Sequence, residues 1–162
     1  MKLSLDFCLA GADVKRFHTV ATLIPETVGH HSHGVACIAM LLDPNASREL
    51  IIAALLHDLS EHQTGDIPSP AKREYGIGEH VSELEERLLS ESGWVNPKLD
   101  RFEARTLKLA DIAHGALTCL KEISMGNSRL RTVFDRYMSY ASQMLLTGRE
   151  KELFNIIEEM SK

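Results

Sequence analysis

Cysteine is scarce in this sequence, and the few cysteines present form no recognisable framework. Cys8, Cys37 and Cys119 are odd in number and widely spaced. This pattern argues against a disulfide scaffold and against a zinc ribbon. Because it is typical of reduced thiols in a cytosol, we expect a cytoplasmic protein.

Long apolar runs and an excess of positive charge are also missing. No run approaches the roughly 20 apolar residues that a membrane-spanning helix needs. Asp6 interrupts the apolar stretch from Leu3 to Ala12, so we expect a first helix there and not a signal peptide. The net charge of -5 argues against binding to polymeric nucleic acid or to an anionic membrane, but it allows a local basic pocket for a small anion.

Convincing β-strand alternation, internal repeats, low-complexity segments and a P-loop are absent from the sequence. Helical periodicity runs through most of the chain instead. It predicts helices over residues 4–14, 27–42, 47–62, 79–92, 98–125, 129–146 and 149–160. With 162 residues, we expect one domain, residues 1–162, with an all-α fold that forms a compact single-domain helical bundle.

The segment around His57 and Asp58 differs from the rest because a predicted apolar helix is followed directly by side chains that can bind metal or transfer protons. Asp58 shares a helical face with Leu50 and Ala54, so its carboxylate points toward the core. A buried carboxylate is costly unless it is paired, protonated or bound to metal. The pattern therefore indicates either a metal site or a hydrogen-bonded His–Asp pair.

Two other predicted helices place similar side chains on apolar faces. His31 lies on the same face as Val35 and Ile38, although a histidine near a helix start can also cap or pack locally. Asp111 lies in the apolar run from Leu107 to Ile112. The set His31, His57, Asp58 and Asp111 suits Zn, Mn, Fe, Co or Ni better than Ca. Without a cysteine ligand, a catalytic site is favoured over a closed structural one.

The predicted loop over residues 65–73 is stiff, because it holds two prolines in three residues. Such a loop suits a role in fixing Asp66 and Lys72, but it can also be a plain connector with solvated charges. Glu61, just before it, is four residues from His57 and can converge on the same side, or it can form a surface salt bridge.

Together these residues resemble a known family. The order His31, His57-Asp58, Asp111 is similar to the HD-domain phosphohydrolase superfamily. The pattern His-Asp-x-x-Glu-x-x-x-x-Asp-x-Pro-x-Pro from His57 to Pro70, and the segments Glu26–Ala36 and Leu107–Asp111, resemble its bacterial 5'-deoxynucleotidase branch. Within that branch the chain looks most like phage dATP triphosphohydrolases, and the likeness covers residues 14–130.

The resemblance implies a function and a role for each residue. We expect hydrolysis of dATP, and of dADP and dAMP, to deoxyadenosine with release of the phosphate chain, through water attack on the α-phosphate. The alternative is a 5'-deoxynucleotidase acting on monophosphates. The implied metal ligands are His31, His57, Asp58 and Asp111, the implied catalytic acids are Glu61 and Asp66, and the implied substrate contacts are Arg16, Phe17, Pro70, Lys72 and Lys108.

The resemblance also implies cofactors and assembly. We expect Zn, Co or Mn at the site, and Mg with the triphosphate. Related enzymes form dimers or hexamers, and the Met and aromatic stripe from Phe134 to Met144 indicates core packing or a homo-oligomer contact. If the chain is phage-encoded, its compartment is the host cytoplasm.

Two departures from the family pattern concern the site directly. The related nucleotidases carry Glu where His30 stands, and Trp where Phe17 stands. The support of the metal ligands and the selection against a 2'-hydroxyl are therefore open. Cyclic-nucleotide or alarmone hydrolases, a ligand-sensing module and a purely structural bundle are the competing classes.

Overall fold

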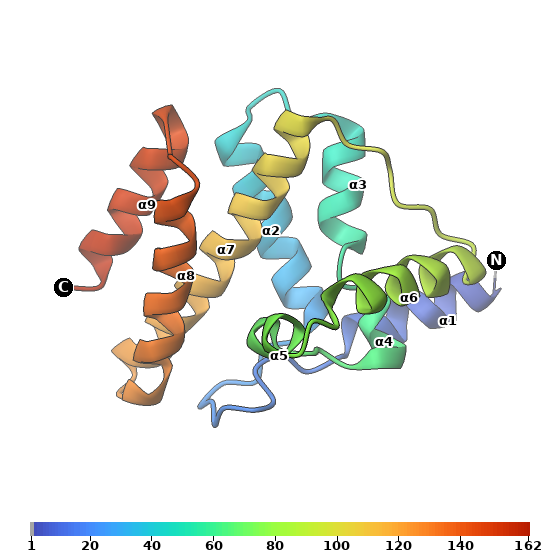
Figure 1. Cartoon of the computed structure of the whole chain (residues 1–162), viewed down its shortest axis with the longest axis horizontal. Coiled ribbons are helices and arrows are strands. Elements are labelled where there is room, and N and C mark those ends of the chain that lie inside the picture. The colour runs from blue at the N-terminus through green and yellow to red at the C-terminus, as the bar shows by residue number, and fades with distance from the viewer. Residues whose placement is uncertain (1) are drawn as a thin grey trace.

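One long helix, α7 (Arg101–Ser124), runs through the middle of the molecule (Figure 1). The computed structural model describes residues 2–162. A capping box begins α7, because Asp100 accepts from the Glu103 amide and Glu103 accepts from the Asp100 amide. These two bonds satisfy amides that a helix start leaves without a partner.

The main core forms where four helices pack around α7. These are α2 (Val28–Leu42), α3 (Arg48–Leu56), α8 (Arg131–Gln143) and α9 (Gly148–Met160). Leu50 of α3 and Leu109 of α7 are fully buried between them, and Phe134 and Phe154 close the core from α8 and α9. Burial of each such side chain contributes about 1.5–3 kcal/mol, so this core fixes α7 relative to α2.

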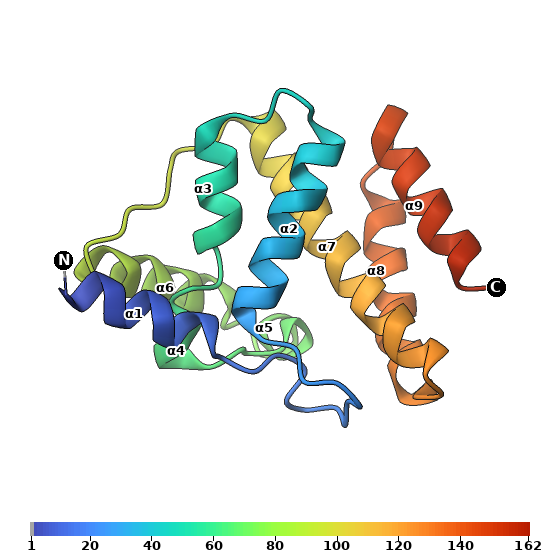
Figure 2. The same ribbon diagram turned by 180° about the vertical axis from the view of Figure 1, so that it is seen from behind.

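A second group of helices covers one end of this core (Figures 1 and 2). It contains α1 (Lys2–Ala12), α4 (Glu61–Thr64), α5 (Ser69–Glu74) and α6 (Gly78–Glu91). Phe7, Leu59 and Leu89 form its own apolar cluster. The Trp94 indole donates to the Ser4 carbonyl at 3.1 Å, which ties the segment after α6 back to α1.

The structure confirms the all-α, compact single-domain fold and corrects two boundaries. Residues 47–62 do not form one helix, because α3 ends at Leu56 and residues 57–60 form a turn. In that turn the amides of Leu59 and Glu61 donate to carbonyls three residues earlier, which tightens the backbone. The predicted loop over 65–73 also contains α5, whose first turn tolerates Pro70 because a proline needs no amide partner there.

These two breaks explain the helix count. Within residues 2–162 there are nine α-helices and a short 3₁₀ segment, η1 (Ser128–Leu130), against the seven helical ranges predicted. The described chain has no β-strand, only one isolated antiparallel bridge between Lys15 and Thr27. This bridge closes the base of the loop that carries Arg16.

Two findings concern the expectations from composition. Cys8, Cys37 and Cys119 are free thiols. Over the described part of the chain, no helix combines the length and apolarity required to cross a bilayer.

Candidate active site

The four predicted metal-ligating side chains come together from three separate segments. His31 projects from α2 and is fully buried, His57 and Asp58 lie in the turn after α3, and Asp111 projects from α7. The side-by-side packing of α2 and α7 brings the first and last of these into range. A break in the helix at residue 57, which the periodicity did not predict, turns the other two toward them.

The separations among these groups match the spacing of ligands around one ion. The Asp58 Oδ2 atom lies 3.3 Å from His57 Nε2 and 3.6 Å from His31 Nε2. His31 Nε2 lies 3.4 Å from Asp111 Oδ1. With bonds of about 2.1 Å, two nitrogen or oxygen ligands of a tetrahedral ion lie about 3.4 Å apart. Two sets of three side chains lie close enough to share one ion: His31 with His57 and Asp58, and Glu26 with His31 and His114.

The hydrogen bonds around the imidazoles also fit a metal site. Among the described residues, the buried Nε2 atoms of His31 and His57 have no hydrogen-bond partner. His57 Nδ1 lies 2.9 Å from the Ala54 carbonyl; because a carbonyl only accepts, Nδ1 carries the hydrogen and Nε2 is left with its lone pair. Two buried ring nitrogens without hydrogen-bond partners, facing two carboxylates, suit a divalent cation.

Arg16, a predicted substrate contact, is also a partner of this cluster. Its guanidinium donates to Asp58 Oδ2 at 2.7 Å and lies 3.4 Å from Glu26. Burial disfavours the charged form of Asp58, but His57 and Arg16 outweigh it and lower the pKa of Asp58. Arg16 therefore supplies positive charge to the carboxylates and also lines the adjoining pocket.

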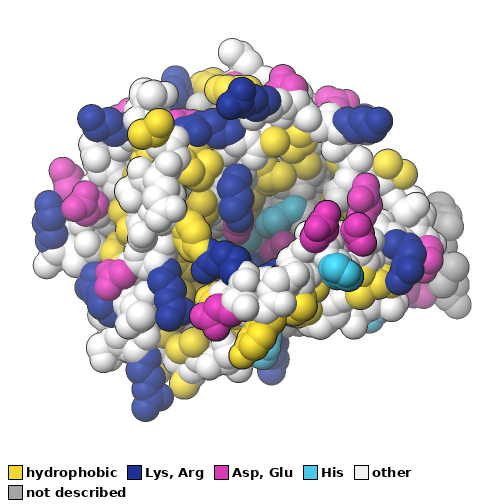
Figure 3. Space-filling view, in the orientation of Figure 1, with side chains coloured by type: hydrophobic (Ala, Val, Ile, Leu, Met, Phe, Trp, Pro, Cys, Tyr) yellow, Lys and Arg dark blue, Asp and Glu magenta, His cyan; other side chains and the backbone are white. Residues whose placement is uncertain are grey.

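A pocket of about 370 Å³ opens beside the cluster, a size within the range of roughly 300–1,000 Å³ of small-molecule sites. Figure 3 shows this hollow with histidine and acidic side chains at its base and Lys and Arg around it. Its walls come from the loop after α1, the α4–α5 segment, α7 and α8. All predicted catalytic and substrate-binding residues line it: Arg16, Phe17, Glu61, Asp66, Pro70, Lys72 and Lys108.

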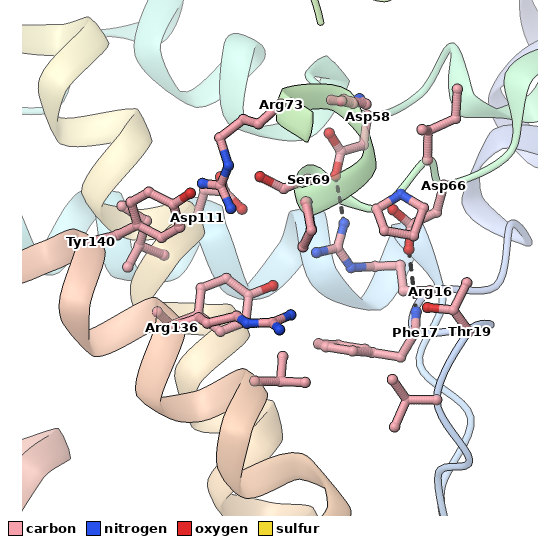
Figure 4. Close-up of a pocket in the computed structure, with 18 of the residues that line it drawn as sticks. Arg16, Phe17, Thr19, Asp58, Asp66, Ser69, Arg73, Asp111, Arg136 and Tyr140 are labelled. Carbon is pink, nitrogen blue, oxygen red and sulfur yellow. Dashed lines mark hydrogen bonds and ion pairs between the residues drawn. The ribbon is translucent and has the colours of Figure 1, made fainter. Parts of the chain in front are cut away.

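Two acids stand at the inner wall of the pocket. Glu61 is 4% exposed, and burial, with repulsion from Asp58 and Asp66, raises its pKa to about 9. Asp66 accepts from the backbone amide of Phe17 at 3.2 Å (Figure 4). Phe17 has φ 55°, an uncommon backbone for a bulky residue, and this contact holds it.

The predicted lysines line the pocket but have partners within the chain. Lys72 lies 3.2 Å from Glu85 of α6, and Lys108 lies 2.8 Å from Asp111 Oδ2. The pair of Lys108 and Asp111 is local, since the two residues are three apart on α7, whereas Glu85 reaches Lys72 from another helix. A phosphate group entering the pocket would compete with these carboxylates for the ammonium groups.

Several pocket residues were missed because their patterns looked ordinary. The Cζ atom of Arg73 lies 4.3 Å from the centroid of the Tyr140 ring, and Arg136 lies beside this pair (Figure 4). Tyr137 also lines the α8 wall. The stripe on α8 was predicted to be core or subunit contact. It does pack in the main core, with Phe134 buried there, but Tyr137 and Tyr140 also line the pocket. Their polar tips were the available signal, since a tyrosine at an apolar position needs a partner.

Comparisons with known proteins agree with this geometry. A family model described as an HD domain matches residues 13–114. A 5'-deoxynucleotidase of Photorhabdus laumondii is 31% identical, over 83% of this chain and 86% of the relative. Another 5'-deoxynucleotidase, from Erwinia tasmaniensis, is also 31% identical, over 74% of this chain and 72% of the relative.

Two solved structures share the fold. The cyanophage S-2L HD phosphohydrolase DatZ, bound to dA and one catalytic Zn²⁺ ion, matches with a TM-score of 0.72 and 19% identity, over 96% of this chain and 95% of that one. The protein PH0347 of Pyrococcus horikoshii matches with a TM-score of 0.66 and 21% identity, over 99% and 98%. The family match and the 31% identical relatives go further than fold: the chain belongs to the HD-domain phosphohydrolases.

Proposed function

We propose that the chain is a metal-dependent hydrolase that cleaves dATP at the α-phosphate, producing deoxyadenosine and inorganic triphosphate. The observation that carries the proposal is the ion-sized gap among His31, His57 and Asp58, which opens directly onto a cation-rich pocket. We propose Zn, Co or Mn at the gap, with Asp111 as fourth ligand. A divalent ion bound there would supply Lewis acidity to a phosphoryl oxygen and to water.

The chain's own residues then manage protons. Water attack forms a new P–O bond and breaks the bond between phosphorus and the 5'-oxygen, so one proton leaves the water and one reaches the 5'-oxygen. We propose that Glu61 and Asp66, both on the pocket wall, divide these two transfers. Acids in different environments commonly take such separate roles.

The charge of the pocket supports a triphosphate over a monophosphate. Five cationic side chains line it: Arg16, Lys72, Arg73, Lys108 and Arg136. Arg16 lies at the metal cluster, whereas Arg73 projects from α5 and Arg136 from α8 (Figure 4). Positive charge contributed by separate segments around the pocket suits a chain of phosphates, and Mg bound to the β- and γ-phosphates would add to it.

The sugar and base fall to the less polar side of the pocket. Phe17 and Pro70 both line it, and we propose that they flank the deoxyribose and the base.

The second candidate function is a 5'-deoxynucleotidase acting on monophosphates. It is favoured by the two relatives of that activity at 31% identity.

The two candidates differ in which substrate is turned over. Purified protein loaded with Co²⁺ or Zn²⁺ should be given dATP, dADP and dAMP separately, with products separated by ion-exchange chromatography. Inorganic triphosphate from dATP supports the first candidate. Activity confined to dAMP would refute it and support the second.

Replacing Arg136, with a matched control variant, tests whether the α8 side of the pocket binds the terminal phosphates. Arg136→Gln should raise the KM for dATP by about tenfold, the value of one lost charge-assisted contact, and change the KM for dAMP little. Arg129→Gln alters an exposed arginine outside the pocket and should change neither. An equal effect of Arg136→Gln on both substrates would contradict the placement of the terminal phosphates.

We also propose that the chain forms a homo-oligomer, a dimer or a hexamer. Leu145, Ile156 and Met160 of the C-terminal region are exposed apolar side chains, which favours contact with a second copy. Light scattering after size exclusion measures the assembly directly, and a mass of one chain at micromolar concentration would contradict it.

A further inference from the structure

A histidine behind the metal cluster, His114, contacts the candidate metal ligand His31 and has no role in the proposed reaction. It projects from α7 one turn after Asp111, and its Nδ1 atom lies 3.0 Å from Nδ1 of His31. The two rings meet nearly edge to face, with centroids 4.9 Å apart and planes at 74°. This is hydrogen-bonding distance between two atoms that can each donate or accept.

We infer that His114 is a positioning residue, which accepts a hydrogen bond from His31 Nδ1 and so fixes His31 with its Nε2 lone pair toward the metal. The inference rests on the proposed metal site. If Nε2 of neutral His31 binds the ion, its hydrogen must be on Nδ1, and Nδ1 can then only donate. His114 Nδ1 is the atom within reach, so it must be the acceptor and His114 must carry its hydrogen on Nε2.

The competing partner for this histidine is Glu26, and the distances favour His31. Glu26 Oε1 lies 3.7 Å from His114 Nδ1, which is beyond a good hydrogen bond. That oxygen already accepts from Thr118 Oγ1 at 2.6 Å, and Glu26 Oε2 faces Arg16. Glu26 is therefore engaged with Thr118 and Arg16, and the Nδ1 atom of His114 is left to bind His31.

The backbone of α2 is adapted to this second imidazole. A Cβ atom at Gly34, one turn after His31, would lie 1.9 Å from Cδ2 and 2.1 Å from Nε2 of His114. No side chain fits there while His114 keeps its place. Glycine is less favourable than alanine inside a helix, so the space beside His114 is kept against the intrinsic preference of the helix.

The test measures metal affinity and histidine tautomers, not turnover. Metal-free protein is titrated with Co²⁺ and followed by its visible absorption. His114→Leu removes the acceptor and should weaken binding 10- to 100-fold, the usual effect of losing such a partner. His114→Asn offers an amide oxygen near the Nδ1 position and should stay within about threefold of the unaltered chain.

Two further variants separate positioning from general damage. Gly34→Ala keeps both histidines but displaces the His114 ring, so it should weaken Co²⁺ binding while far-ultraviolet circular dichroism shows a folded helical chain. His33→Leu changes an exposed histidine on the same helix, which contacts Cys37, and should leave affinity unchanged. In Zn²⁺-loaded protein, ¹⁵N-correlated spectra should show His31 protonated at Nδ1 and His114 at Nε2.

Distinct results overturn the inference and the proposed function. Equal Co²⁺ affinity of His114→Leu and the unaltered chain would overturn the inference alone, as would His31 protonated at Nε2. Two ions per chain would also overturn it, because Glu26, His31 and His114 would then hold a second ion. Failure of the unaltered chain to bind Co²⁺ would overturn the metal site itself, and the inference with it.

Discussion

The buried acid Glu61 gives the metal-free protein an unusual pH dependence. Its pKa is about 9 in the folded chain, against an ordinary value of 4.5 when unfolded. As the pH rises between these values, the unfolded chain releases the proton and the folded chain keeps it. The stabilisation from this group is complete below pH 4.5 and falls by about 1.4 kcal/mol for each pH unit up to about 9.

The window from pH 7 to 8.5 isolates this effect. His114 has a pKa lowered by burial to about 3, so it affects stability only below its unfolded value of about 6.5. Over the window, Glu61 should remove about 2 kcal/mol of stability, which lowers the melting temperature by about 4–8 °C in a chain of this size. Glu61→Gln has no proton to lose, so its melting temperature should lack this fall.

Circular dichroism melts in the presence of a chelator measure the effect. The control is Glu86→Gln, which changes an exposed glutamate on α6 and should melt with the pH dependence of the unaltered chain. Saturation with Zn²⁺ should shrink the pH dependence, because a nearby cation favours the carboxylate of Glu61. An identical slope for Glu61→Gln and the unaltered chain would refute the reasoning.

Three other predictions concern the site. Asp58→Ala should abolish Co²⁺ binding and turnover, and retained activity would refute the site. Because the substitution leaves Arg16 with one fewer counter-charge, it should also lower the free energy of unfolding by about 3–5 kcal/mol in a denaturant titration. Gly115→Ala would place a Cβ 2.4 Å from Tyr137 Cζ, so it should push that ring into the pocket and raise the KM for dATP about tenfold or more, whereas an unchanged KM would contradict the α8 wall. Asp66→Asn should slow dATP hydrolysis about 10²–10⁴-fold but spare a p-nitrophenyl phosphodiester if Asp66 is the acid, and equal loss on both substrates would assign it the other proton.

The fold was largely predictable because apolar residues recur at helical spacing along long helices. The pattern located α2, α7 and α9 closely, and α7 extends over most of its predicted range. It failed at residues 57–60 because the apolar spacing continues through the turn, and the tight hydrogen bonds that break the helix leave no compositional trace. The stiff loop was predicted, but α5 was not, since the two prolines indicated a loop although a proline is also tolerated in the first turn of a helix.

The site was predictable where a polar side chain stands at an apolar, inward-facing position, because few structural roles explain such a residue. His31 on an apolar stripe and Asp58 after an apolar run both pointed to the interior, and the structure brings them together. The partners that depend on tertiary packing were not visible. Glu85 reaches Lys72 only because α6 folds back along α5, and His114 meets His31 only because α7 lies beside α2.

Hydrolysis of dATP in ¹⁸O-labelled water, followed by ³¹P NMR, tests the central claim most directly. Attack at the α-phosphate predicts unlabelled deoxyadenosine and inorganic triphosphate with one ¹⁸O atom on a terminal phosphorus, formed only when a divalent metal is present. Label in the deoxyadenosine hydroxyl, or products of dADP with phosphate or of dAMP with pyrophosphate, would contradict it.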